Sequence, residues 1–335
     1  MYDVSQVQKV QPTQGSVHVD GPLTNISLAI MQGQDQFVAR KVFPQIGVKN
    51  QSNSYFTFDE SFFNRNDMGK RAPGTEASGG GYEVGTGTYS CDVYAYRHDI
   101  PKQVRENADA QINVDREGTT LCTYKALISE EVNWAASNFT NGIWNRDVQG
   151  VSGTPSGAQV KQWNDAASTP IEDIRAEMTT MQAATGVRPN TLTVNQQVLD
   201  ALLDHPDIID RIKYGQTPGA PALAGKDYLK ALFGVKEMHV MGAIVNSADE
   251  GATASNGFIG GKNALLAYVP DSPGLMTPSA GYTFNWTGMS GGAQGSFIKR
   301  YPMTHLDSDR IEIQTSYDHK VVSGGLAMLF YDVIA

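Results

Sequence analysis

A long glycine-rich stretch lies between two segments that alternate apolar and polar residues, and this arrangement constrains the fold more than any other feature. The alternating segments are VKNQSNSYFTFDESFF and CDVYAYRHDIP, and such alternation is typical of β-strands. Residues 47–101 are therefore predicted to form an extended two-stranded excursion. The stretch between the strands carries seven glycines from Gly69 to Gly87 and few side chains for a core. Because structureless loops of this length are uncommon inside compact domains, we expect it to be flexible or to lie on another molecule.

The residues before this excursion are predicted to form an extended arm. Residues 1–46 contain short apolar clusters separated by Gly-Gln-Asp-Gln and followed by Phe43-Pro44. Residues 1–50 carry four basic and three acidic side chains, so the arm is near neutral and lacks the charge of a nucleic-acid-binding tail. A chain that begins with such an arm is expected to hold a neighbouring molecule.

After Pro101 the apolar residues recur at a helical spacing. Between Val114 and Asn138 they return every three or four positions, and Asn113 precedes them as an N-cap. This pattern predicts one amphipathic helix of about 25 residues, roughly 37 Å long. Adjacent residues on a helix point about 100° apart. We therefore expect Glu130-Glu131 to form a solvated face rather than a catalytic acid–base pair.

The remaining sequence predicts an α/β unit followed by closing strands, so the fold class is α+β. Helices are predicted from Thr169 or Pro170 to Ala184 and at Gln196–Leu203, Asp207–Lys213 and Tyr228–Phe233; strands are predicted at Thr191–Val194, Met238–Val245 and Ala264–Val269. The last forty residues alternate again and are expected to form two strands interrupted by Ser323-Gly324-Gly325.

The composition excludes several classes of protein. Hydrophobic residues make up 40% of the chain and charged residues 18%, which is ordinary for a globular protein, and the net charge of −9 provides no basic face for nucleic acid. Cys91 and Cys122 stand alone, without the spacing of a zinc finger or a disulfide framework, which fits a reducing compartment. The first twenty residues lack an apolar signal, and no apolar run is long enough to cross a bilayer. We therefore expect a cytoplasmic protein without a membrane partner.

No catalytic or cofactor signature has the context that its chemistry requires. Gly288-Met289-Ser290-Gly291-Gly292 has the letters of a nucleophile elbow, but the residues that follow are glycine-rich and β-like where a helix is needed. A serine hydrolase using Ser290 is therefore the weaker hypothesis, which esterase or peptidase turnover lost in Ser290→Ala would support. The six histidines are scattered, without metal-ligand spacing. We predict no enzyme activity, no cofactor and no metal.

Several local motifs, in a particular order, carry a resemblance to a known family. They are LTNIS and FVARKVFP in the arm, RAPGTE and TGTY in the glycine-rich stretch, and the run from Thr185 to Gln216. Over essentially its whole length the chain resembles the HK97-fold major capsid proteins of tailed bacteriophages. None of these motifs is a catalytic fingerprint, so the specificity of the resemblance comes from their number and order.

The resemblance implies a domain organisation and a set of contacts. Residues 1–46 would be the N-terminal arm, 47–101 the extended β-hairpin called the E-loop, 102–166 and 296–335 the P-domain, with a spine helix at about 114–138, and 167–295 the α/β A-domain. Contacts between subunits are expected at Phe43, Pro44, Lys70, Arg71 and Glu76. Some relatives join a loop lysine to an asparagine of another subunit, but for Lys70 an ordinary surface lysine is the favoured interpretation.

The resemblance also implies a function. Copies of the chain would assemble into the hexamers and pentamers of an icosahedral phage head, built in the bacterial cytoplasm and enclosing double-stranded DNA without reading its sequence. Expected partners are other copies, a scaffolding protein, a portal and possible decoration proteins. The alternatives are an encapsulin-like nanocompartment shell, which would enclose an enzyme, and a fibre or tail-tube subunit, which would form filaments.

Overall fold

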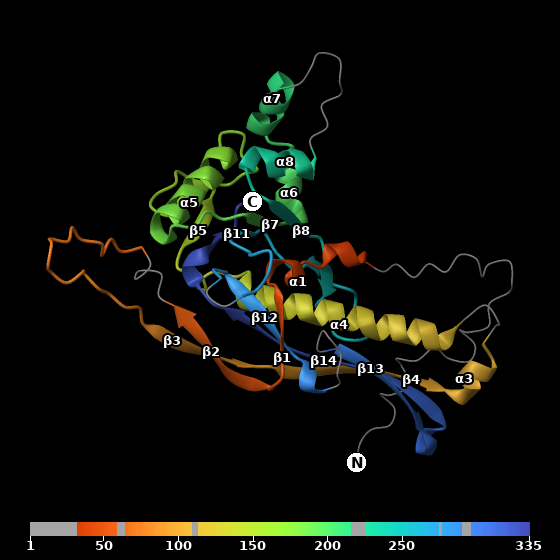
Figure 1. Ribbon diagram of the computed structural model, residues 1–335. Coiled ribbons are helices and arrows are strands. Elements are labelled where there is room, and N and C mark those ends of the chain that lie inside the picture. The colour runs from red at the N-terminus through yellow and green to blue at the C-terminus, as the bar shows by residue number, and fades with distance from the viewer. Residues whose placement is uncertain (1–31, 59–63, 109–112, 216–224, 275–276, 290–295) are drawn as a thin grey trace.

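Figure 1 shows the computed structural model, which describes residues 32–58, 64–108, 113–215, 225–274, 277–289 and 296–335. Two β-sheets form the body of the molecule, and the long helix α4 (Val114–Asn138) contacts both of them. A two-stranded hairpin projects from one side of this body. The helices that follow α4 gather around the upper sheet and form a separate lobe.

Helix α4 has the bounds that its sequence pattern predicts. The Asn113 side chain accepts a hydrogen bond from the Arg116 backbone N–H, and Asp115 and Glu117 place negative charge at the positive end of the helix. Gly118 allows close packing on the sheet, because an added Cβ would lie 3.0 Å from the His98 side chain. Toward its C-terminus the helix buries Trp134 beneath the other sheet.

The lower, five-stranded sheet is built around one long strand, β14 (Ser308–Val321). This strand pairs antiparallel with three others, which are β4 (Asp92–Pro101), β12 (Gly281–Trp286) and β13 (Ser296–Met303). Strand β1 (Gln45–Val48) adds in parallel to the outer edge of β12. Ile311 and Ile313 are two positions apart on β14, so their side chains point to the same face of the sheet. Both pack with Ile100 and Cys122.

The upper, six-stranded sheet forms the core of the lobe. Its strand order is β6 (Gln159–Lys161), β5 (Asp147–Val151), β15 (Ala327–Tyr331), β11 (Ala264–Ala267), β7 (Thr191–Asn195) and β8 (Glu237–Met241). The helices packed around it are α5 (Pro170–Thr185), α6 (Gln196–Leu203), α7 (Pro206–Gly215) and α8 (Lys226–Phe233). The sequence predicted these four helices within a few residues, because each has local start and stop signals, such as the left-handed Gly186 that ends α5.

The hairpin differs from the predicted one in its second strand. Strand β2 (Ser52–Phe58) pairs with β3 (Val84–Ser90), inside the stretch that was expected to be loop, whereas β4 leaves the hairpin and pairs with β14. The glycines of β3 are compatible with a strand because Gly87 lies opposite Tyr55, whose ring occupies the space that a side chain would need. The projecting excursion is therefore β2, β3 and the residues between them.

The two sheets draw their strands from distant parts of the chain. The six-stranded sheet combines β5, β6 and β15 with β7, β8 and β11, and the five-stranded sheet contains β12. Strand pairing decides this, because β15 lies between β5 and β11. The predicted strand Met238–Val245 is also divided, into β8 and β9 (Ile244–Asn246), and β9 pairs with β10 (Asn256–Phe258).

Short elements complete the described chain. They are the helices α1 (Ala39–Val42) and α3 (Lys102–Glu106) and the 3-10 turns η2 (Gln34–Gln36), η3 (Thr287–Met289), η4 (Thr304–Leu306) and η5 (Gly324–Leu326). Both cysteines are buried and free, and burial raises the pKa of the Cys91 thiol to about 12. Among the described residues, no helix is long and apolar enough to cross a membrane.

Candidate functional site

The described part of the arm folds onto its own subunit. The buried carboxylate of Glu131 accepts hydrogen bonds from the backbone N–H groups of Val38 and Ala39, with donor–acceptor distances of 2.9 to 3.0 Å. These N–H groups lie at the start of α1, where a helix has no internal acceptors for them. The expectation that Glu130-Glu131 is a solvated face is therefore wrong, because the returning arm covers both side chains.

A second contact fixes the same segment. Arg40 of α1 makes a bidentate ion pair with the buried Glu130, through hydrogen bonds of 2.6 to 2.9 Å. One turn later, Phe43 packs edge-on against Trp134 and Trp144. Phe43 is fully buried in the subunit, so its side chain has no surface to offer to a neighbouring copy.

Burial perturbs the titration of this cluster. It raises the pKa of Glu131 to about 7, although the N–H donors of Val38 and Ala39 act in the opposite direction. On β14, burial and the charge of Arg40 lower the pKa of His319 to about 4. The carboxyl group that binds the arm therefore changes its protonation state near neutral pH.

The hairpin presents apolar side chains to solvent. Phe56, Met68, Tyr82 and Val84 are between 49% and 93% exposed, which is unusual for large apolar side chains concentrated on one projection. A two-stranded hairpin is only marginally stable by itself in water. This projection therefore has the properties of a surface that another molecule covers.

The predicted contact residues fall into two separate places. Lys70, Arg71 and Glu76 are all exposed between β2 and β3, where the Arg71 side chain donates to the Thr75 backbone carbonyl. Pro44 is half-buried within the arm, next to the buried Phe43. The structure thus brings the three loop residues together and separates them from the two arm residues.

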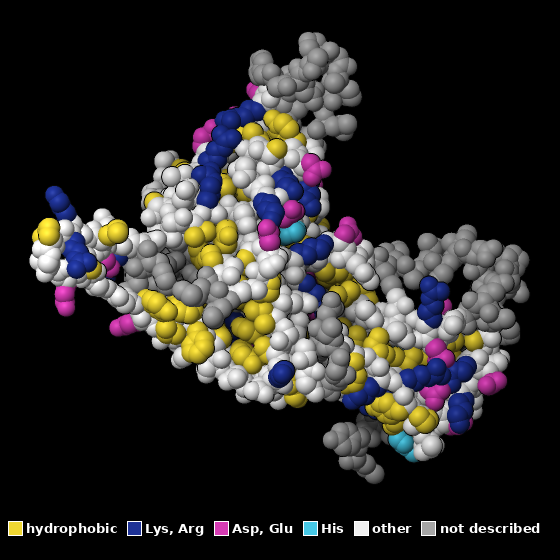
Figure 2. Space-filling view, viewed as in Figure 1, with side chains coloured by type: hydrophobic (Ala, Val, Ile, Leu, Met, Phe, Trp, Pro, Cys, Tyr) yellow, Lys and Arg dark blue, Asp and Glu magenta, His cyan; other side chains and the backbone are white. Residues whose placement is uncertain are grey.

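A groove lies between the base of the hairpin and the body of the subunit. Its volume is about 740 Å³, and its walls include Tyr55 and Phe58 on one side and Val187 and Phe284 on the other. Figure 2 shows hydrophobic side chains gathered over the base of the hairpin and the adjoining part of the body. The sequence analysis missed this groove because its walls come from segments far apart along the chain.

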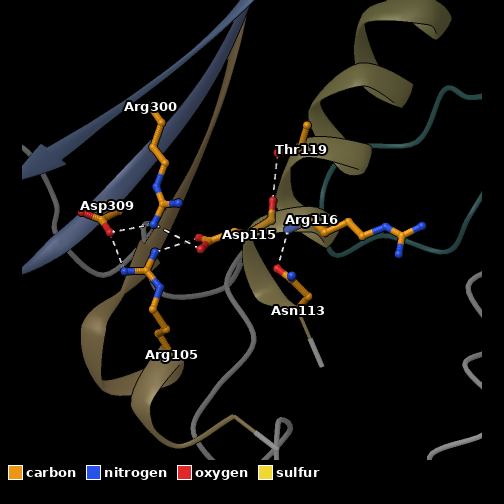
Figure 3. A network of polar contacts seen from close by, with 7 residues as sticks. All are labelled: Arg105, Asn113, Asp115, Arg116, Thr119, Arg300 and Asp309. Atoms are coloured by element: carbon orange, nitrogen blue, oxygen red, sulfur yellow. Dashed lines mark hydrogen bonds and ion pairs between the residues drawn. The ribbon is translucent and has the colours of Figure 1, made fainter. Parts of the chain in front are cut away.

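At the other end of the five-stranded sheet, four charged side chains form a closed network (Figure 3). Asp115 lies between Arg105 and Arg300, at 2.8 and 3.1 Å, and Asp309 contacts the same two arginines. The arginines hold the pKa of Asp309 below its usual range. The network joins α3, the first turn of α4 and strands β13 and β14. It therefore fixes the position of the first turn of α4 relative to the five-stranded sheet. No local pattern in the sequence indicated it.

The described residues do not assemble a hydrolytic site. Ser290 lies outside them. Ser168 and His205 are 3.0 Å apart, but both are buried, and His205 Nδ1 accepts a hydrogen bond from the Asp207 backbone N–H. The ring proton therefore sits on Nε2, facing Ser168, so this imidazole does not act as a base toward the hydroxyl. Nor do three His, Cys, Asp or Glu side chains of the described chain gather as metal ligands.

Comparisons with known proteins agree on one kind of fold. The model of the family described as Phage major capsid protein E matches residues 155–313, a little under half of the chain. The major capsid protein of Burkholderia phage BcepMu is 26% identical over 281 residues, which cover 81% of this chain and 84% of that protein.

Solved structures extend the likeness to 90% of the chain or more. A phage-related protein from Bordetella bronchiseptica RB50 is 23% identical with a TM-score of 0.67, covering 90% of this chain and 94% of that one. The mature capsid subunit of bacteriophage PhiM1 is 11% identical with a TM-score of 0.56, covering 96% and 98%. The chain has the HK97 capsid fold. The predicted resemblance is confirmed. We use E-loop below as the name for β2, β3 and the residues between them.

Proposed function

We propose that this protein is the major capsid protein of a tailed phage, a structural subunit that assembles with copies of itself into a closed head. The match to a phage capsid family and the capsid relative of phage BcepMu support this function. They also favour a phage head over the encapsulin-like alternative, because both are phage proteins.

The observation that carries the proposal is the E-loop. The body of the subunit closes its own core, whereas the E-loop, which projects from that body, exposes Phe56, Tyr82 and Val84 to solvent. In a shell, such a projection lies on an adjacent copy, and burying its apolar area stabilises both partners. Many repeated contacts of this kind stabilise a shell without a tight pairwise bond, and closed symmetry limits its growth.

The finer features of the proposal follow from this role. Copies form hexamers and pentamers in the bacterial cytoplasm, with a scaffolding protein and a portal as further partners and possible decoration proteins on the outer surface. The net charge of −9 suits an inner wall that encloses DNA without gripping its phosphates. Lys70, Arg71 and Glu76, which are exposed on the E-loop, make contacts between subunits, and Pro44 contributes at the arm.

Deleting residues 66–81 tests the role of the E-loop. The subunit should still fold, because these residues are exposed and lie outside every buried cluster of the described chain. Shell formation should be lost, because the deletion removes the contact surface. Thermal unfolding of the unassembled subunit measures the first result, and sedimentation with negative-stain imaging measures the second. A subunit that no longer folds, or shells that form normally, would contradict the proposal.

A length-matched variant serves as the control. Replacing residues 66–81 by a Gly-Ser linker of equal length keeps the connection between β2 and β3 but removes the side chains of Lys70, Arg71 and Glu76. We expect this variant to remain defective in assembly. If it assembles like the native chain, the loop is needed only for its length and the proposed contact residues are wrong.

The content of the particles discriminates the shell alternatives. Particles isolated from infected cells should contain double-stranded DNA, whereas an encapsulin-like shell would contain an enzyme. The hydrolase alternative has its own test, which is esterase or peptidase turnover that disappears in Ser290→Ala.

A further inference from the structure

The groove between the E-loop and the body of the subunit has the size of a small-molecule site. Its volume of about 740 Å³ lies within the range of about 300 to 1,000 Å³ that is typical of ligand pockets. One wall belongs to the E-loop. The other comes from the end of α5, from strand β12 and from the chain just before β12.

Aromatic rings form much of this groove. Tyr55, Phe56 and Phe58 belong to β2, and Tyr282 and Phe284 belong to β12. Tyr55 contacts Phe284 at a centroid distance of 5.3 Å, so ring packing joins the E-loop to the body at this place. Rings pack on one another at centroid distances of about 4.5 to 7 Å, and walls of this kind favour an occupant that is itself aromatic.

The groove also selects against charge. No Asp, Glu, Lys, Arg or His of the described residues lines it. A charged group placed there would lose its hydration without gaining a partner. The groove therefore matches a neutral molecule.

One polar group of the groove wall has no partner. Tyr282 is only 6% exposed, and its hydroxyl forms no hydrogen bond with the described residues. Burial raises the pKa of Tyr282, and the nearby Ser279 side chain and Gly274 backbone lower it without reaching hydrogen-bond geometry. The Ser279 hydroxyl donates instead to the Gly281 carbonyl. Because buried hydroxyls are seldom left unpaired, a hydrogen-bond acceptor on an occupant of the groove would complete the site.

We propose that the groove binds a neutral aromatic molecule whose carbonyl oxygen accepts a hydrogen bond from the Tyr282 hydroxyl. Aromatic ketones and amides are the chemical class that combines these properties. The site lies within one subunit, so the proposal does not depend on assembly. The bound molecule contacts both β2 and β12 and therefore holds the E-loop against the body.

Three probes of the same size test the binding chemistry. They are 4-acetylbiphenyl, which is neutral and has a carbonyl acceptor, 4-ethylbiphenyl, which lacks the acceptor, and biphenyl-4-carboxylate, which is charged. Equilibrium dialysis with the unassembled full chain measures their dissociation constants. We expect the ketone to bind once per subunit, about fivefold more tightly than the ethyl compound and at least about tenfold more tightly than the carboxylate. No saturable binding of the ketone, or equal affinity for the ketone and the carboxylate, would overturn the proposal.

Tyr282→Phe tests the role of the hydroxyl. This variant keeps the ring and should keep the melting temperature of the native chain, because the hydroxyl has no partner to lose. Its affinity for the ketone should fall to that for the ethyl compound, which should itself be unchanged. The control is Tyr301→Phe, whose hydroxyl donates to Glu312 outside the groove, and there the fivefold preference should remain. A preference that survives in Tyr282→Phe would refute the assignment of the hydrogen bond.

Proteolysis gives a second readout that locates the site. Chymotrypsin cleaves after aromatic residues, and cleavage after Tyr55, Phe56 or Phe58 requires β2 to leave the groove wall. At ten times its dissociation constant, the ketone should slow this cleavage about tenfold, because it binds only the closed arrangement. Cleavage after Met68, which is 93% exposed and outside the groove, is the internal reference and should not change. Unchanged cleavage of β2 in the presence of bound ketone would place the ligand elsewhere and overturn the proposal.

Discussion

Glu131 joins the arm to α4 through a carboxylate that has almost no contact with water. Only 1% of the residue is exposed, and its acceptor oxygens bind two N–H groups that are 92 and 93 positions away in the sequence. Burial of an ionised carboxylate is unfavourable, which is why the pKa rises from 4.5 to about 7. Docking of the arm is therefore coupled to uptake of a proton.

This coupling gives a prediction for the free energy of unfolding at neutral and alkaline pH. The unfolded carboxyl keeps its pKa of 4.5, whereas the folded one has a pKa of about 7, so the folded subunit binds a proton that the unfolded chain does not. The free energy of unfolding should therefore rise as the pH falls from about 8.5 to about 7, by roughly 0.5 kcal/mol from this group. Urea unfolding of the unassembled subunit in Glu131→Gln should show this slope reduced. Equal slopes in the two proteins would contradict the assignment.

Two buried histidines give a prediction for the free energy of unfolding at acidic pH. The folded pKa values of His239 and His319 are lowered from 6.5 to about 4, mainly by burial. The unfolded chain therefore binds more protons below about pH 6.5, and the free energy of unfolding should fall as the pH falls further. Together with Glu131 this gives a stability maximum slightly below neutral pH. In His319→Gln the loss between about pH 6.5 and 4 should be smaller, which the same urea titration measures.

At the scale of elements, the sequence predicted the helix boundaries that are determined by local signals. The N-cap Asn113 and the apolar period gave the bounds of α4, and Gly186 marked the end of α5. Strand β3 was missed because its glycines are more typical of a loop than of a strand. They are compatible with a strand only because Tyr55 covers Gly87 from the opposite strand, and that contact is not local in the sequence.

The pairing of Tyr55 and Gly87 gives a prediction for the E-loop. A Cβ on Gly87 would lie 2.5 Å from the Tyr55 ring, so Gly87→Val should push this ring away from Phe284, which it contacts at a centroid distance of 5.3 Å. We expect faster proteolysis within residues 52–90 and a cost of about 1 kcal/mol or less in global stability. Limited proteolysis with mass spectrometry measures the first effect. The control is Thr88→Val on the same strand, and equal cleavage rates in the two variants would contradict the prediction.

At the scale of the whole molecule, the resemblance gave the fold, and the pattern of the sequence gave most of its elements, but neither gave the strand partners. Strand β15 enters the six-stranded sheet between β5 and β11, which the alternation of the last forty residues did not indicate. The arm was expected to be extended, yet it contains the short helix α1, and Phe37, Val38, Ala39, Val42 and Phe43 are buried in the subunit. Both features depend on contacts between residues far apart in the chain, which periodicity and capping signals do not encode.

The groove and the contacts of the arm also depend on residues that are far apart in the chain. Tyr55, Val187 and Phe284 meet only after the hairpin, the lobe and the lower sheet have assembled. The glycine-rich stretch, by contrast, indicated from its composition alone that this segment is either flexible or lies on another molecule. The exposed large apolar side chains of the E-loop favour the second interpretation.

Electron cryomicroscopy of particles assembled from the full chain tests the central claim most directly. The account predicts closed icosahedral shells in which each subunit has the fold of Figure 1 and the E-loop of one copy lies against the body of the next. Filaments, persistent monomers, or shells whose E-loops contact no neighbouring copy would contradict it.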